Sequence, residues 1–160
     1  MLGDLSSELA ALDERIARVD GRLKQSLAES DLCQRLAQVE GVGPMIATAM
    51  AAAVSDPTAF KNGRQLAAGL GLVPRQQSSG GKPVLLGISK RGDRYVRSLL
   101  IHGARAVVSR AAMKTDARSR WIAEKQRLRG TNRTCVAVAN KNARILWALM
   151  AKHETYQRVA

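Results

Sequence analysis

The spacing of apolar residues over residues 4–38 is the feature that most restricts the fold. Leucine, isoleucine and valine recur there every three to five positions, with charged residues between them. The apolar positions are Leu5, Leu9, Leu12, Ile16, Val19, Leu23, Leu27 and Leu32. This period predicts one long amphipathic helix. Most of the spacings also fit the core positions of a coiled coil, so the helix either pairs with a second copy or packs on its own domain.

The remainder of the chain is predicted to be helical as well. Aromatic residues make up only 3% of the sequence, so the core must come from Ala, Leu, Val and Ile, which suit close-packed helices. We therefore expect an all-α fold, with a coiled-coil helix over residues 1–35 and a helical DNA-binding domain over residues 36–160. Cys33 and Cys135 lack the spacing of metal ligands, and free buried thiols are expected.

The formal net charge of +13 points to a polyanionic partner, either nucleic acid or an anionic membrane. Residues 1–40 hold five of the 26 basic and eight of the 13 acidic side chains, so the basic excess lies in residues 41–160. The sequence has no apolar run long enough to span a bilayer and begins without a signal-peptide pattern. We expect a cytoplasmic protein with no membrane partner.

The residues from Leu36 to about Asp56 have the pattern helix, tight turn, helix. Gly41 and Gly43 permit the turn, and Pro44 suits the first position of the second helix. The pattern resembles the helix-hairpin-helix motif of DNA-binding proteins, in which the N–H groups at a helix start hold a phosphate. The alternative is a glycine-rich hairpin of helices that only packs.

A Gly- and Pro-rich segment over residues 71–87 interrupts the helices. It predicts a loop, or a short β-hairpin that turns at Gly80 and Gly81. A helix is expected to start near Ser89, and the cations of its first turns would oppose the helix dipole unless an anion lay nearby. The candidate DNA-binding residues are Gly41, Gly43, Arg75, Lys82, Ser89, Lys90, Arg91 and Arg94.

Two serines, Ser78 and Ser79, lie in this segment. The sequence places no histidine or carboxylate beside them, which argues against an acyl-transfer triad. A serine could instead attack phosphorus, because neighbouring Arg and Lys side chains would stabilise the charge that develops on the phosphate oxygens.

Three stretches together carry a resemblance to a known family: LAQVEGVGPMIATAMAAAV, FKNGRQLAAGLGLVPRQQSSGGK and LGISKRGDRYVRSLLIHGARAVV. They resemble the C-terminal domain of the IS110/IS116/IS902 transposases, most closely the IS1111-like branch, over residues 32–151. The resemblance implies that Ser79, with Ser78 as the fallback, is the nucleophile that cuts and rejoins DNA. It also implies a RuvC-like N-terminal domain with an acidic metal-binding cluster, and guidance to the target by a structured RNA.

The chain departs from the family pattern because that metal-binding half is missing. The acids beyond residue 40 are Asp56, Asp93, Asp116, Glu124 and Glu154, and their spacing does not suggest a magnesium site. We expect no metal in this chain, Mg²⁺ only together with the RuvC-like domain, and DNA binding without cleavage.

Partners expected are DNA, a guide RNA and a second copy bound through the N-terminal helix. Two alternatives remain: a non-catalytic helix-hairpin-helix DNA-binding module, and a basic RNA-binding protein. The shortage of aromatic residues for base stacking argues against the second.

Overall fold

The fold is mostly helical, as the sequence predicts. The computed structural model describes residues 2–79 and 82–157, without the side chains of residues 2, 78, 79, 82 and 83. The elements are α1 (Leu2–Glu29), α2 (Asp31–Ala37), α3 (Pro44–Ala53), η1 (Pro57–Ala59), α4 (Gly63–Gly69), β1 (Pro74–Ser79), β2 (Lys82–Ile88), α5 (Arg94–Arg110), η2 (Ala111–Met113), α6 (Ala117–Arg129) and α7 (Thr131–Ala151). In the part of the chain so described, none of the helices is both long and apolar enough to cross a membrane.

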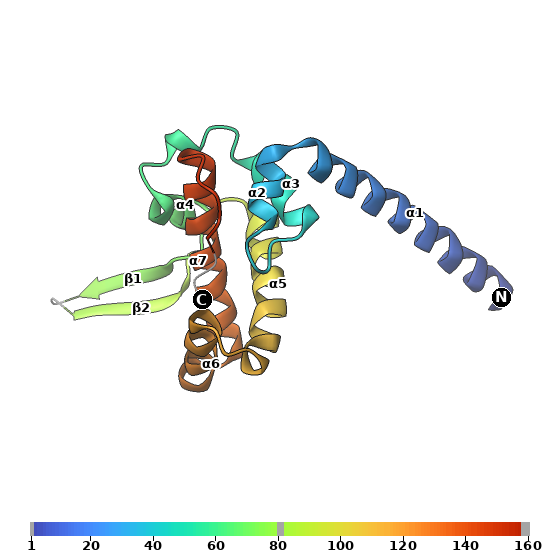
Figure 1. The fold of residues 1–160 in the computed structure, drawn as a ribbon. Helices are drawn as coiled ribbons and strands as arrows, with labels where there is room; N and C mark the ends of the chain where they lie inside the picture. The colour runs from blue at the N-terminus through green and yellow to red at the C-terminus, as the bar shows by residue number, and fades with distance from the viewer. Residues whose placement is uncertain (1, 80–81, 158–160) are drawn as a thin grey trace.

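Helices α5 and α7 run alongside each other through the centre of the body (Figure 1). The shorter helices α2, α3, α4 and α6 pack around this pair and close a single core. Its fully buried larger members are almost all aliphatic, as in Leu36, Leu100 and Leu146. Cys33 and Cys135 are buried and free, which confirms the expectation for the two thiols.

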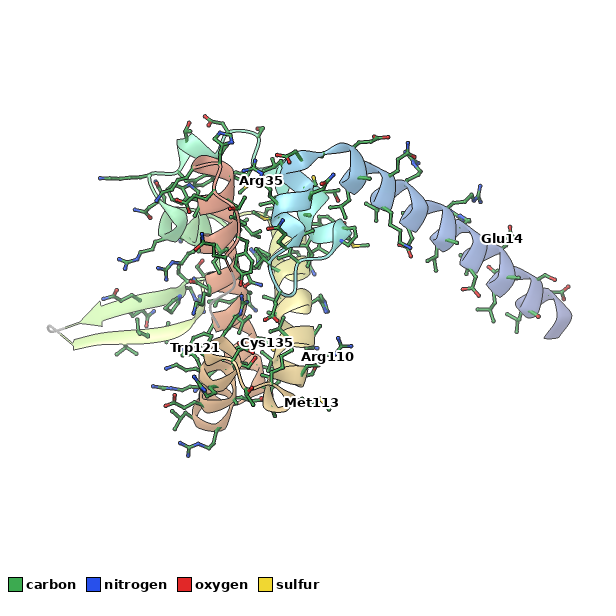
Figure 2. All side chains as sticks on the ribbon, in the orientation of Figure 1. Glu14, Arg35, Arg110, Met113, Trp121 and Cys135 are labelled. Carbon is green, nitrogen blue, oxygen red and sulfur yellow. The ribbon has the colours of Figure 1, made fainter. Side chains whose placement is uncertain are left out.

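Helix α1 leaves the body and projects away from it (Figure 1). The predicted helix over residues 4–38 is therefore broken: Ser30 caps α2 by accepting a hydrogen bond from the Cys33 N–H at 3.3 Å, and α1 ends at Glu29. The side chains of α1, Glu14 among them, extend into open space (Figure 2). Its apolar positions from Leu5 to Val19 are 44–63% exposed. Packing of the whole helix on its own domain is thus wrong, and only the end near Leu27 contacts the core.

The turn between α2 and α3 is held against α5 by two glycines. Gly41 has a φ of +83°, which favours glycine, and a Cβ there would lie 2.8 Å from the carbonyl oxygen of Gly103. A Cβ on Gly103 would in turn overlap the carbonyl of Gly41. Gly41 is therefore explained by close packing of the turn on α5. Gly43 caps α3 without a side-chain bond, and a Cβ there would meet open space. Phosphate binding at this helix start stays a prediction.

Candidate nucleic-acid interface

The Gly- and Pro-rich segment forms a β-hairpin that stands out from the helical body on the side away from α1 (Figure 1). The strands are antiparallel, and Ser79 pairs with Lys82 across the ribbon. The predicted turn at Gly80 and Gly81 lies outside the described residues. The sequence left a loop and a short β-hairpin open for this segment, and the structure has the hairpin.

The two strands differ in chemistry. On β1, Arg75, Gln76 and Gln77 are exposed and polar. On β2, Val84 and Leu85 are 52% and 67% exposed, although both are apolar. The hairpin thus presents a polar strand beside an apolar strand, both accessible from outside the body.

The base of the hairpin joins the segment of residues 89–93, which precedes α5 and contains Lys90 and Arg91. We call this segment the basic loop. The N–H of Ser89 donates to the carbonyl of Val73 at 2.8 Å, and the N–H of Lys90 donates to the carbonyl of Gly71 at 3.2 Å. These bonds continue the pairing of the strands past Ile88. The loop is therefore anchored to the body at the point where the hairpin leaves it.

The prediction that this helix starts near Ser89 is wrong. Lys90 and Gly92 have φ values of +56° and +80°, which end any regular helix, and α5 begins at Arg94. Asp93 is the N-cap and accepts a hydrogen bond from the Val96 N–H at 3.0 Å. Lys90 and Arg91 therefore precede the helix, and the carboxylate at its start complements the dipole that the predicted cations would have opposed.

Two glycine contacts fix the shape of the basic loop. A Cβ on Gly92 would overlap the carbonyl oxygen of Gly69, at the end of α4. A Cβ on Gly71, whose φ is +70°, would overlap the backbone of Arg91. Only glycine satisfies both the backbone angle and the close approach at these positions. The loop is thus clamped against the end of α4.

Arg97 completes the clamp from inside. Its side chain is buried, with 7% of the residue exposed, and its Nη1 donates to the carbonyls of Leu70 at 3.0 Å and Arg91 at 3.1 Å. In the sequence Arg97 looks like one more cation of this basic stretch, and nothing there indicates that it is buried. The structure shows a positioning role instead, since one guanidinium joins the basic loop to the segment after α4.

The candidate residues fall into two groups along the hairpin. Ser79 and Lys82 are paired at its outer end, while Ser89, Lys90, Arg91 and Arg94 lie at its base or just beyond, and Arg75 lies one residue from the base. Ser79 lies five residue steps along the extended strand from Pro74, which corresponds to about 16 Å. The structure does not bring the basic loop next to Ser79. The side chains of Ser78, Ser79 and Lys82 lie outside the described residues.

Some cations and acids of residues 41–160 are engaged in the fold. On α6, Arg118 donates from Nη2 to Asn142 Oδ1 at 2.6 Å and from Nη1 to the Tyr156 hydroxyl at 3.1 Å. Asp56, Asp93 and Asp116 all accept hydrogen bonds as helix N-caps. Among the described residues, no three His, Cys, Asp or Glu side chains gather closely enough to hold a metal ion.

The fold and this site define a basic, mostly helical protein with a projecting β-hairpin. Residues 33–120 match the description "Transposase IS116/IS110/IS902 family", and the chain belongs to this family. It is 52% identical over 157 residues to the "Probable family 20 transposase" of Pseudomonas aeruginosa, covering 98% of this chain and 46% of that protein.

Two further relatives are transposases of named insertion sequences, and the first of them supports an IS1111-like assignment. It is 48% identical over 157 residues to the "Transposase for insertion sequence element IS1111A" of Coxiella burnetii, covering 98% of this chain and 43% of that protein. It is 34% identical over 158 residues to the "Transposase for insertion sequence element IS1328" of Yersinia enterocolitica, covering 99% of this chain and 47% of that protein. The chain thus spans less than half the length of these relatives.

Proposed function

We propose that this chain is the DNA-binding part of an IS110/IS1111-like transposase, and that its hairpin presents a serine for DNA strand cleavage and rejoining. The observation that carries the proposal is the projecting hairpin with Ser79 near its outer end, built on a base clamped by Gly71, Gly92 and Arg97. A nucleophile on such an arm can enter a DNA groove while the helical body stays outside. Lys82, opposite Ser79 in the register, is the proposed source of positive charge at the attacked phosphate.

The basic loop has a different task in this proposal. The base of the hairpin is about 16 Å from Ser79, which equals roughly five nucleotide steps at 3.4 Å per step along one strand. Lys90, Arg91 and Arg94, all exposed, would therefore hold backbone phosphates that flank the cut rather than the phosphate under attack. The metal chemistry of the full transposase would come from a RuvC-like domain with Mg²⁺, and a structured guide RNA would select the target.

DNA binding by the chain alone is tested by a salt titration. We expect log K for a short duplex to fall linearly with log of the salt concentration, with a slope of about −0.9 for each phosphate contacted. At least three contacts are expected from Lys90, Arg91 and Arg94. Fluorescence anisotropy measures the slope, and EDTA should leave it unchanged. A slope near zero would contradict DNA binding through phosphate contacts. Cutting of the duplex by the chain alone would contradict the proposal that cleavage needs the RuvC-like domain.

A non-catalytic DNA-binding module is the second candidate function. It is supported by the exposed cations of the basic loop, which can hold backbone phosphates without any chemical step. For the chain in isolation the two candidates predict the same binding, and they separate only when the serine is changed in a full-length protein.

We further propose that α1 pairs with α1 of a second copy. Leu5, Leu12 and Val19 alternate with Leu9 and Ile16 at spacings of four and three, and all are exposed along a helix about 42 Å long. Burying such a seam is favourable by roughly 1.5–3 kcal/mol for each large side chain.

The double change Leu12→Asp with Ile16→Asp should convert the dimer to a monomer, because two charges would be buried at the centre of the seam. Sedimentation equilibrium measures the mass. The matched control is Arg18→Ala with Lys24→Ala, which alters exposed residues of α1 outside the seam and should leave the dimer intact. A wild-type chain that stays monomeric at high micromolar concentration would refute the pairing.

A further inference from the structure

A large groove lies beside the hairpin, apart from the basic loop. Its volume is about 1520 Å³, and it is bounded by α7, the start of α4, the inner part of β2 and Trp121 of α6. Clefts that hold small molecules usually measure about 300–1000 Å³. This groove is larger than that range, and its size suits a segment of a polymer better than a small ligand.

The charge of the groove has one sign. Four cations line it, and none of its described lining residues is acidic. The cations are Arg64 from α4 and Arg133, Lys141 and Arg144 from α7. Within the described residues, Arg64, Arg133 and Arg144 form no ion pair, and all three are exposed. A concave surface with cations of one sign attracts an anion and raises its local concentration.

The fold brings the backbone segments that carry two of these cations close together. A Cβ on Gly63 would lie 2.8 Å from both the Cα and the carbonyl oxygen of Arg144, so the start of α4 approaches the backbone of α7 closely. Arg64 follows Gly63 directly, and the side chains of Arg64 and Arg144 line the same groove. Like charges that line one groove repel each other, and an anion bound there would offset that repulsion.

The remaining cations extend the charge along α7. Arg133 and Arg144 are eleven residues apart on the helix, which corresponds to about 16 Å, and Lys141 lies between them. The Lys141 ammonium group lies 4.7 Å from the centre of the Trp121 ring, which holds it in place. Leu85 and Leu86 of β2 form the opposite, apolar wall. The groove thus offers a row of charges beside an apolar surface, as a nucleic-acid strand with anionic backbone and apolar bases requires.

We propose that this groove, lined by Arg64, Arg133, Lys141 and Arg144, is a second nucleic-acid site that holds the phosphodiester backbone of a strand beside the hairpin. The inference rests on the proposed DNA-binding function and adds a surface that the basic loop does not include. A strand in this groove would touch β2 on one side, and so would help to fix the direction in which the hairpin points.

The test compares three variants of the whole chain on short duplex DNA, single-stranded DNA and RNA of the same sequence. Arg133→Ala with Arg144→Ala removes two charges from the groove. Arg133→Lys with Arg144→Lys keeps them, and Arg18→Ala with Lys24→Ala removes two charges from α1 instead. Thermal unfolding followed by circular dichroism checks that each variant folds like the wild type.

The alanine pair should make the slope of log K against log salt less steep, by about 1.8 on a duplex or about 1.4 on a single strand, whereas the lysine pair and the α1 pair keep the wild-type slope. The probe with the largest change identifies the kind of strand that occupies the groove. Unchanged slopes for the alanine pair on all three probes would contradict the proposal that the groove binds nucleic acid, but would not contradict the proposed function. A wild-type chain that binds none of the probes would overturn the proposed function and the groove with it.

Discussion

Replacement of Ser79 by alanine, in a full-length transposase that carries these 160 residues, is expected to abolish DNA strand cleavage and rejoining. In the proposed mechanism the serine oxygen attacks the phosphorus, a strand end leaves, and the hairpin becomes linked to DNA through a phosphodiester. Alanine has no oxygen to form that bond, so the rate should fall by roughly 10³-fold or more. Recombination between element ends on a plasmid, counted by selection, measures the effect.

Ser78→Ala is the matched control, because Ser78 is the neighbouring residue on the same strand. It should retain recombination within a few-fold of wild type. Both variants should also bind duplex DNA with the wild-type salt slope, since neither change removes a charge. Normal recombination by Ser79→Ala together with a dead Ser78→Ala would move the nucleophile to Ser78, and normal recombination by both would remove the serine mechanism.

Gly92→Ala is expected to destabilise the chain by roughly 2–5 kcal/mol. The left-handed backbone costs an alanine about 1–2 kcal/mol, and overlap of the new methyl group with the Gly69 carbonyl adds about 1–3 kcal/mol. For a domain of this size the midpoint of thermal unfolding should fall by roughly 5–15 °C. DNA binding should weaken as well, because the loop that carries Lys90 and Arg91 loses its clamp.

Gly87→Ala serves as the control for that experiment. Gly87 lies on β2, its φ is not in the left-handed region, and a Cβ there would have no neighbour within 4 Å. Its midpoint should stay within about 2 °C of wild type, in keeping with the small effects of surface substitutions. If Gly92→Ala behaved like Gly87→Ala, the packing of the basic loop on α4 would be wrong.

The helical architecture was predictable because local signals dominate it. Apolar periodicity located α1, and the Gly- and Pro-rich composition located the hairpin. The details that failed depend on caps and on backbone angles. In the sequence Ser30 is one more polar residue within an amphipathic pattern. The periodicity does not indicate that one helix ends there and that Ser30 caps the next. Ser89 and Asp93 are both residue types that cap helices, and the backbone angles of Lys90 and Gly92, which exclude a start at Ser89, cannot be seen in the sequence.

The candidate site was predictable only where its residues are neighbours in sequence. Ser79 and Lys82, which pair across the ribbon, are only three positions apart in the sequence. The burial of Arg97 could not be predicted, because burial depends on the whole fold and a buried arginine looks like any other arginine in a sequence. The groove was missed for the same reason: Arg64 and Arg144 are 80 positions apart, and only the packing of α4 on α7 brings them together.

The most direct measurement of the central claim is to map the covalent link between protein and DNA. A full-length transposase that carries this chain would be trapped on a substrate whose cut strand cannot be rejoined, then digested with trypsin and sequenced by mass spectrometry. The tryptic peptide from Gln76 to Lys90 contains Ser78, Ser79 and Ser89, and fragmentation separates them. We predict a nucleotide phosphate on Ser79. A nucleotide adduct on a residue outside the hairpin, or strand cutting without any adduct, would contradict the account.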